Sequence, residues 1–273
     1  MLNENYLIIA HYHSKGLFRQ DFLNLLRQQQ KKFSKIYLIS TNLKKKEIKK
    51  ISKKIYVKIR ENKGYDFLSW KIGIDKFLKE NRNNLKKKHI FLLNSSYYFY
   101  DNKKFVRQIL KFKEKNPNKI WSLSKSYEIK EHLQSGFYCF PAKFLSHQSY
   151  YKWWNDIKGF KDRQVIVMKY ELGFSDYLIK NKFDIDCIFK KNLILKPNTF
   201  FEKIINKVKD IFWKEPKLYK KNPTHYFWRS YLKKFGIIKI ELIKKNPIKT
   251  DLSYLKTLDR KKNYKLLEES YKN

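Results

Sequence analysis

Short apolar runs alternate with longer amphipathic segments through the first hundred residues. Four runs have the length and composition of buried strands: 6–12, 35–42, 55–59 and 89–93. Three segments between and after them are predicted helices: 17–33, 44–52 and 67–80. In the first, Phe18, Phe22 and Leu25 have the spacing of one helix face. Strands that alternate with helices predict βαβ crossovers and an α/β fold, with a mainly parallel sheet flanked by helices.

The second half has a less regular pattern. Two more strands are predicted at 120–123 and 136–140, and two more helices at 150–157 and 171–181. From about residue 202 the chain is basic and aromatic, with predicted helices at 201–213 and 224–235, the latter with Thr224 as its N-cap. We therefore expect an α/β core over residues 1–200, and a basic, largely helical extension over residues 201–273 that packs on it.

The charge of the chain is strongly positive. The 63 Lys and Arg against 25 Asp and Glu give a formal net charge of +38. Such a field favours anionic partners, namely a nucleotide diphosphate, an acidic membrane surface or nucleic acid. An abundance of Lys, Asn, Ile, Tyr and Phe also results from a genome poor in G and C, so the composition leaves the origin of the charge open.

Other features exclude several classes of protein. At 42% hydrophobic and 17% aromatic residues, the chain can bury a sizeable core and is not disordered. Cys139 and Cys187 lie far apart and form no C-x-x-C, which argues against a zinc site or a disulfide framework. No apolar stretch is long enough to span a bilayer, so the expected location is the cytoplasm. No G-x-S-x-G and no P-loop motif occurs.

Polar residues gather where the predicted strands end. They are His11, Thr41, Asn42, the loop 61–66 and the triplet Asn94-Ser95-Ser96. In parallel sheets ligands bind outside the carboxyl ends of the strands, so these residues are candidates for a ligand site. The alternative is that strand ends carry turn residues in every protein.

The loop 61–66 is the most specific of these elements. Gly64 permits a backbone path that a side chain would obstruct. Lys63 can neutralise phosphate charge, and Asn62 and Asp66 can hydrogen-bond sugar or ribose hydroxyl groups. The helix that follows directs backbone N–H groups towards the same crevice.

Further residues are candidates for catalysis and acceptor binding. Glu171 and Asp176 lie five apart on a predicted helix, on roughly opposite faces, and Glu171 is the candidate general base for deprotonating an acceptor hydroxyl. An ordinary helix-start glutamate is the alternative. The segment His132-Leu133-Gln134-Ser135 is a candidate polar pocket, although a lone histidine such as His132 is more often structural.

Five blocks in order resemble the rhamnan synthesis protein F family over roughly residues 6–247. They are 61–67 with Ser69-Trp70-Lys71, Leu92-Leu93-Asn94-Ser95-Ser96, 132–135, Val165-Ile166 with Lys169-Tyr170-Glu171, and 222–228. The resemblance implies a GT-A-like glycosyltransferase that transfers a hexose, often rhamnose, in building rhamnan, O-antigen or capsule. It also implies that Glu171 falls where the base of such enzymes lies, giving single displacement with inversion.

The resemblance assigns the candidate residues to two groups. The nucleotide-diphosphate sugar is expected at the donor group: His11, Thr41, Asn42, Asn62, Lys63, Gly64, Asp66, Asn94 and Ser96. The acceptor is expected at His132, Gln134, Ser135 and Asp176. It would be a lipid-linked oligosaccharide at the inner face of the plasma membrane, where the protein would bind peripherally to anionic lipid. The basic extension carries the aromatic residues suited to that surface, unless they pack into the core: Phe212, Trp213, Tyr219, Tyr226, Phe227 and Trp228.

Two departures from the family pattern affect these expectations. The family usually reads Asn-Asp-Ser where this chain has Asn94-Ser95-Ser96, and Asp101 is the nearest carboxylate. Magnesium or manganese is therefore possible but not supported, and we expect no required cofactor and no metal ligands, with Lys or Arg donors on the diphosphate instead. At Gly136-Phe137 the family often has an aromatic residue in place of the glycine. An inactive transferase-like scaffold and a basic nucleic-acid-binding protein are the alternatives, although no nucleic-acid-binding motif supports the latter.

Overall fold

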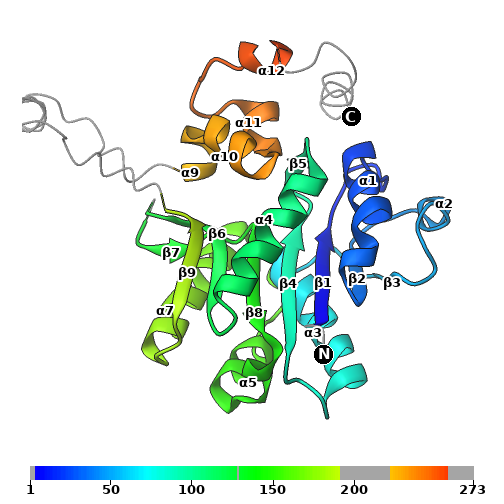
Figure 1. Cartoon of the computed structure of the whole chain (residues 1–273), viewed down its shortest axis with the longest axis vertical. Helices are drawn as coiled ribbons and strands as arrows, with labels where there is room; N and C mark the ends of the chain where they lie inside the picture. Colours follow the sequence, from blue (N-terminus) through cyan, green and yellow to red (C-terminus); the bar gives the residue numbers. More distant parts are fainter. Residues whose placement is uncertain (1–3, 128, 191–221, 258–273) are drawn as a thin grey trace, which may run out of the picture.

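The apolar runs of the sequence form the central sheet of the protein. The computed structural model describes residues 4–127, 129–190 and 222–257. In these residues the strand order is β3-β2-β1-β4-β8-β6, with β7 and β9 both paired to β6 (Figure 1). The strands of this sheet are β1 Glu4–His11, β2 Lys35–Ser40, β3 Tyr56–Ile59, β4 Lys88–Asn94, β6 Ile120–Ser126, β7 His132–Leu133, β8 Phe137–Pro141 and β9 Ile185–Phe189.

Strand direction confirms the predicted α/β class with a mainly parallel sheet. Strands β3, β2, β1 and β4 are parallel neighbours, whereas β8 is antiparallel to both β4 and β6. From β1 the chain adds β2 and β3 on one side and then β4 on the other side. The order therefore reverses between β1 and β4, and this reversal is where open α/β sheets bind ligands.

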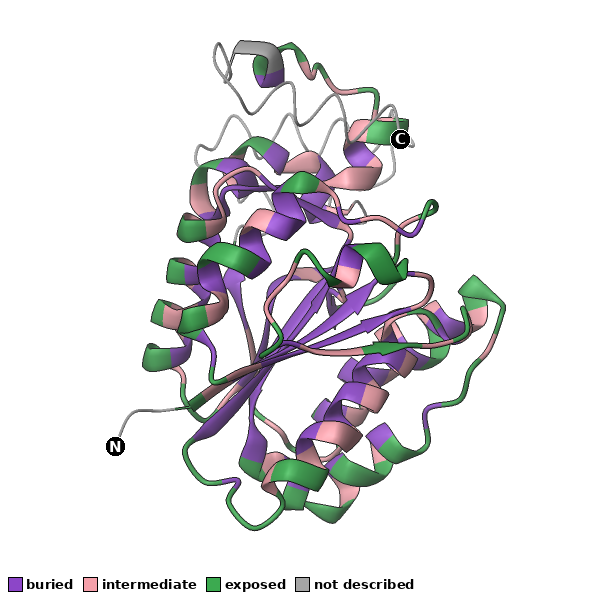
Figure 2. Cartoon of the chain, turned by 90° about the vertical axis from the view of Figure 1, so that its right-hand side faces the viewer, coloured by how far each residue is buried: buried purple, intermediate pink, exposed green. Residues whose placement is uncertain are grey.

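Helices cover both faces of the sheet, and Figure 2 shows their exposed surfaces turned away from a buried sheet. Side chains alternate along β1, so Leu7 and Ile9 face one helical layer while Ile8 and Ala10 face the other. The first layer contains α1 Gln20–Gln29, α4 Asn102–Lys115 and α10 Trp228–Phe235. The second contains α3 Tyr65–Asn81, α5 Gln148–Asn155 and α7 Gly173–Lys180.

The C-terminal segment 222–257 lies beyond the carboxyl ends of β1 and β4 (Figure 1). Its strand β10 Ile237–Lys239 pairs antiparallel with β5 Tyr97–Phe99, which directly follows β4 in the chain. Trp228 is buried with Tyr98, Ile238 and Leu242. The short helices of this segment are α9 Pro223–Tyr226, α11 Ile240–Lys245 and α12 Ser253–Thr257.

Several predicted elements differ from the observed ones. The predicted helix 17–33 is α1 followed by a 3-10 turn, Gln30–Lys32, and the predicted helix 44–52 is only the single turn α2 Lys45–Ile48. Thr224 was the wrong N-cap: the Asn222 side chain accepts the hydrogen bond from the Thr224 N–H, because Pro223 occupies the first helical position. The predicted helix 201–213 and the core boundary near residue 200 lie outside the described residues.

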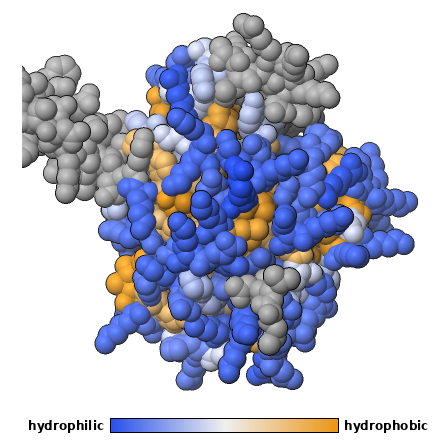
Figure 3. Space-filling view, in the orientation of Figure 1, coloured by the Kyte–Doolittle hydropathy of each residue, from blue (hydrophilic) through white to orange (hydrophobic). Residues whose placement is uncertain are grey.

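The face of the molecule seen in Figure 3 is predominantly hydrophilic. Figure 3 shows polar side chains over most of the visible face, with small apolar areas between them. Among the described residues, no helix combines the length and hydropathy needed to cross a bilayer. Tyr226 and Phe227 are half-buried and Trp228 is buried, whereas Phe212, Trp213 and Tyr219 are outside the described residues.

Candidate functional site

A pocket of about 770 Å³ opens at the carboxyl ends of β1, β2 and β4. It is lined by polar residues from strand ends, from the start of α3 and from the C-terminal segment. Six Lys or Arg side chains and only two carboxylates, Asp66 and Glu241, are among them. The cations are Arg19, Arg60, Lys161, Arg163, Lys244 and Lys245. This excess of positive charge in a concave site attracts anionic ligands.

Arg60 shapes the loop that forms one wall of the pocket. Its guanidinium donates to the backbone carbonyls of Glu61, Lys63 and Tyr65, and its Nε donates to Ser69 Oγ at 2.8 Å. Gly64 has φ +66°, and its N–H donates to the carbonyl of Phe160 at 2.8 Å. A Cβ on Gly64 would lie 2.7 Å from Leu68 Cβ, so only glycine fits this turn.

Asp66 and Asn94 form the polar floor of the pocket. Asn94 Nδ2 donates to Asp66 Oδ2 at 2.7 Å. Asp66 is half-buried and lines the pocket. This burial raises the pKa of Asp66 to about 6, although the Asn94 hydrogen bond, Lys239 and Arg60 oppose the shift. The pKa of Asp66 therefore lies closer to neutral pH than that of an ordinary aspartate.

The triplet that follows β4 does not offer oxygen atoms to a divalent metal ion. Ser95 Oγ accepts from the Tyr12 N–H at 3.0 Å and donates to the Tyr12 carbonyl at 3.1 Å. Asn94 Oδ1 accepts from the Ser96 N–H and hydroxyl. Asp101 caps α4 by accepting from the Lys104 N–H at 2.8 Å. Among the described residues, no three His, Cys, Asp or Glu side chains cluster as metal ligands. These residues do not fit a metal on the diphosphate.

Lys239, the last residue of β10, contacts the same triplet. Its Nζ donates to Ser96 Oγ at 2.7 Å and lies 4.4 Å from the centre of the Tyr97 ring. Burial lowers the pKa of Lys239, although the negative charges of Glu171, Asp66 and Glu241 oppose the shift. The positive charge of its ammonium group therefore acts on both carboxylates, Asp66 and Glu171.

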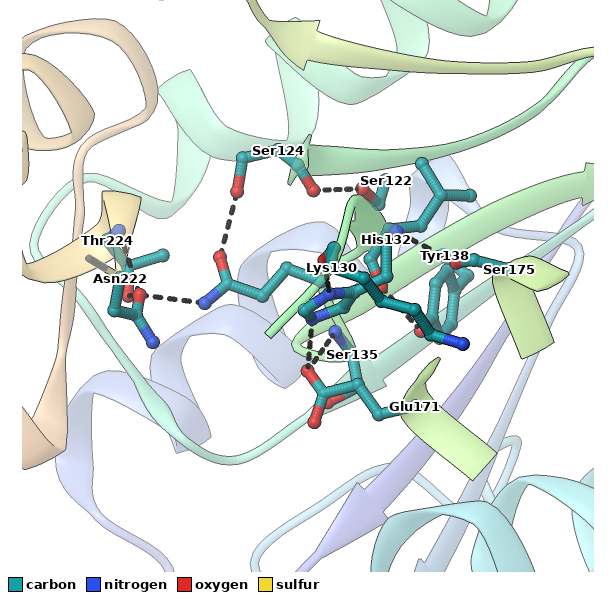
Figure 4. Close-up of polar contacts among 12 residues, drawn as sticks. Ser122, Ser124, Lys130, His132, Ser135, Tyr138, Glu171, Ser175, Asn222 and Thr224 are labelled. Carbon is teal, nitrogen blue, oxygen red and sulfur yellow. Dashed lines mark hydrogen bonds and ion pairs between the residues drawn. The ribbon is translucent and has the colours of Figure 1, made fainter. Parts of the chain in front are cut away.

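Glu171 lies beside this pocket, in the network shown in Figure 4. Its Oε1 accepts from the Ser135 N–H at 3.1 Å and lies 3.8 Å from His132 Nε2. Burial acts to raise the pKa of Glu171, but the nearby His132 imidazole and the hydrogen bond from the Ser135 N–H outweigh it, and the net shift is downward. Asn94 Nδ2 also lies 3.5 Å from the Ser135 carbonyl, so Asp66, Asn94, Ser135 and Glu171 form one chain of contacts.

A π-helical segment, Val167–Leu172, presents Glu171 to this network. The predicted helix 171–181 thus begins as α7 only at Gly173, and Glu171 belongs to the preceding π turn. Such turns are rare and occur frequently at functional sites. With 18% of its side chain exposed, Glu171 remains accessible to a ligand.

The structure brings most of the predicted donor residues together. Six of the nine line the pocket: His11, Thr41, Asn62, Asp66, Asn94 and Ser96. The other three do not line it. Lys63 forms an ion pair with Glu61 at 2.6 Å, Asn42 donates to the His13 carbonyl, and Gly64 lies within the loop wall.

Only two of the four predicted acceptor residues contact Glu171. His132 and Ser135 contact Glu171. The Gln134 side-chain amide makes two hydrogen bonds within the protein. Its Oε1 accepts from Ser124 Oγ and its Nε2 donates to Asn222 Oδ1, each at 2.8 Å. Asp176 is largely exposed, lies apart from the network and pairs with Lys130. Position 136 accepts only glycine, because a Cβ there would lie 2.3 Å from the Tyr97 hydroxyl.

Some pocket residues had no signal in the sequence. Lys161, Arg163 and Lys244, which line the pocket, and Lys239, which contacts Ser96 at its edge, come from segments distant in the chain from the strand ends. In sequence they are indistinguishable from the many surface lysines and arginines. Arg19 also lines the pocket, and its guanidinium donates to the carbonyls of Ser95 and Tyr97, which fixes the β4–β5 turn.

Comparison with known proteins identifies a family. The family described as rhamnan synthesis protein F matches residues 36–221. The uncharacterized protein y4gN of Sinorhizobium fredii (strain NBRC 101917 / NGR234) is 22% identical over 192 residues, which are 69% of this chain. The chain spans about half the length of that relative, since the match covers 49% of it.

Two solved structures align with the chain at low similarity. A 4-diphosphocytidyl-2C-methyl-D-erythritol synthase aligns with 76% of this chain and 98% of its own, at 10% identity and a TM-score of 0.42. A CMP:2-keto-3-deoxy-manno-octonic acid synthetase complexed with CTP aligns with 78% of this chain and 100% of its own, at 10% identity and a TM-score of 0.41. At such scores neither structure bears on the activity of this chain.

Proposed function

Because the chain belongs to the rhamnan synthesis protein F family, we propose that it is a glycosyltransferase acting in polysaccharide synthesis. It would move a sugar from a nucleotide-diphosphate donor to a glycan acceptor. The observation that carries this proposal is the cation-lined pocket at the carboxyl ends of β1, β2 and β4, with the carboxylate of Glu171 held beside its floor.

The pocket has groups suited to each part of the donor. Arg163, Lys161 and Lys244 attract the diphosphate. Thr41 Oγ1 is buried and has no hydrogen-bond partner among the described residues, so a ligand hydroxyl or base would satisfy it. Tyr12 and Tyr65 also line the pocket and are 52% and 45% exposed, which leaves ring faces available to stack on a nucleobase.

Glu171 is the proposed general base. It is held ionised by its hydrogen bonds and can accept the proton of an acceptor hydroxyl as that oxygen attacks the anomeric carbon. The bond from the anomeric carbon to the diphosphate oxygen breaks as the new glycosidic bond forms, giving inversion. The pocket cations stabilise the negative charge on the departing diphosphate.

A panel of nucleotide sugars tests this function. The purified protein is incubated with each sugar donor and a glycan acceptor, with manganese and with EDTA, and released nucleoside diphosphate is measured. We expect release with one donor class, and roughly 10²–10⁴-fold slower release when Glu171 is replaced by Gln. No release from any donor would favour the inactive scaffold, and salt-sensitive DNA binding in its place would favour the nucleic-acid-binding alternative.

We further propose rhamnose as the sugar and a lipid-linked oligosaccharide as the acceptor, at the inner face of the plasma membrane. The net charge of +38 supports binding to anionic lipid, at about 1 kcal/mol for each Lys or Arg near the surface. Co-sedimentation with vesicles should therefore require anionic lipid and weaken with salt. Sedimentation that is indifferent to both would contradict a peripheral location.

A further inference from the structure

We propose that the ammonium group of Lys239 is the resident cation of the diphosphate site. It would hold the donor diphosphate where many nucleotide-sugar enzymes place a divalent metal ion. This inference deepens the proposed function and rests on it. The Asn94-Ser95-Ser96 triplet has no carboxylate that could hold a metal ion on the diphosphate. The inference assigns the binding of the diphosphate to Lys239 instead, a residue far along the chain from this triplet.

The fold places Lys239 at this point through backbone contacts. In the pairing of β10 with β5, Lys239 lies opposite Tyr97. The next residue, Ile240, donates its N–H to the carbonyl of Ser96 at 2.9 Å. Lys239 Nζ then reaches Ser96 Oγ at 2.7 Å, and Ser96 lines the pocket. Strand pairing therefore fixes the side chain at the β4–β5 turn.

The local environment leaves the ammonium group short of an anion. An ammonium group has three N–H donors, and Lys239 has one neutral hydroxyl and one aromatic ring as its contacts. In the described part of the chain, no carboxylate lies within ion-pair distance of its Nζ, although the charges of Glu171 and Asp66 act on it. Lys239 is half-buried, and charges withdrawn from water are normally paired, so a ligand anion is the missing partner.

The neighbouring side chains reinforce this assignment. The oxygen atoms of Asn94, Ser95 and Ser96 all take part in hydrogen bonds within the protein, and that of Ser96 already accepts from Lys239. A divalent ion bound there would need these oxygen atoms and would be repelled by the ammonium group. A diphosphate oxygen has the opposite charge and accepts the free N–H groups.

Calorimetric titration of wild-type protein and Lys239→Met tests the inference. The ligands are UDP, GDP, dTDP and inorganic pyrophosphate, each measured with EDTA and with manganese. We expect wild-type affinity to be the same in both buffers. Lys239→Met should lose roughly tenfold to a hundredfold in affinity, the range for one charge-assisted hydrogen bond, and manganese should not restore it. The matched control is Lys234→Met, because Lys234 is a half-buried lysine of the same segment that donates to the Ile188 carbonyl and does not line the pocket.

Folding of the variants is followed by thermal denaturation. Because Lys239 is only half-buried and its loss leaves no buried acceptor unpaired, Lys239→Met should melt at the wild-type temperature or above it. If it does not fold, Lys239→Gln, which keeps a donor for Ser96 without the charge, takes its place and should show the same loss of affinity.

The outcomes separate this inference from the proposed function. Diphosphate binding by Lys239→Met equal to wild type, or wild-type binding that requires manganese, overturns the role of Lys239 even where sugar transfer is found. Pyrophosphate binding that depends on Lys239 supports the role of Lys239 even where no nucleotide sugar is a donor, in which case only the proposed function fails.

Discussion

Asn94 Nδ2 donates to Asp66 Oδ2 at 2.7 Å, and this hydrogen bond joins the end of β4 to the first turn of α3. The same nitrogen lies 3.5 Å from the Ser135 carbonyl, and the Ser135 N–H donates to Glu171. One amide therefore connects the floor of the cationic pocket to the proposed base. Its position makes the geometry of the proposed donor and acceptor sites interdependent.

Replacing Asn94 by Ala should destabilise the protein by about 1–3 kcal/mol, the effect of leaving a buried polar group without its partner. The loss should be larger at pH 8 than at pH 5, because the hydrogen bond favours the ionised form of Asp66, whose pKa is about 6. Urea denaturation at pH 5 and at pH 8 measures the loss of stability. Asn62→Ala is the control, since Asn62 also lines the pocket but is exposed. An equal loss of stability in Asn94→Ala and Asn62→Ala would contradict the proposed contribution of the hydrogen bond between Asn94 and Asp66.

Asp66→Asn should change how stability depends on pH. The pKa of Asp66 is raised by burial from 3.8 to about 6, so its stabilising effect is present below pH 4 and is lost as pH rises through 6. The variant should lose less stability than wild type between pH 4 and pH 7. It should be about 1–2 kcal/mol more stable at pH 7, a figure reduced from the full shift because the pocket is open to water. If the stabilities of wild type and Asp66→Asn change with pH in parallel, the raised pKa of Asp66 is contradicted.

Glu171→Gln should lower the rate of sugar transfer by roughly 10²–10⁴-fold while donor binding stays unchanged, since the base acts on the acceptor proton. Single-turnover kinetics and donor titration separate the two effects. Asp176→Asn is the matched control, because Asp176 is exposed, pairs with Lys130 and lies outside the network. A rate that survives in Glu171→Gln would remove Glu171 from the mechanism.

His132→Gln should shift the pH profile of transfer. The His132 imidazole, 3.8 Å from the Glu171 carboxylate, helps to hold the pKa of Glu171 below its usual value, so its loss should raise that pKa. The acidic limb of kcat/KM against pH should then move to higher pH, with activity recovered in alkaline buffer. A purely structural histidine would lower the rate at every pH and leave the limb in place.

The fold was predictable where the signal is local. The buried runs of β1, β2 and β4 and the amphipathic helix α3 follow hydrophobic periodicity, and their order indicates a parallel sheet. Strands β5 and β10 have three residues each and pair across about 140 positions of the chain, so no window of sequence reveals them. The antiparallel direction of β8 likewise depends on pairing with β4 and β6.

The candidate site shows the same division. Asp66, Asn94 and Ser96 were predictable because turn residues after parallel strands share one edge of the sheet. Lys239 and Arg163 were not, because the C-terminal segment and the short helix α6 Arg163–Ile166 before the π turn reach that edge only in the folded chain. Gln134 looked suited to a ligand, but its amide bridges β6 and Asn222, a use that only three-dimensional contacts reveal.

The most direct test of the account is whether the pocket binds a nucleoside diphosphate. Calorimetric titration of UDP, GDP and dTDP should show binding of at least one to the wild-type protein. The double variant Lys161→Gln, Arg163→Gln should bind it roughly tenfold more weakly or worse, since both cations line the pocket. The pair Lys152→Gln, Lys158→Gln, which lines a separate groove beside Tyr177, should bind like wild type. Binding of none of the three diphosphates, or equal affinity in all proteins, would contradict the assignment of this pocket to an activated sugar.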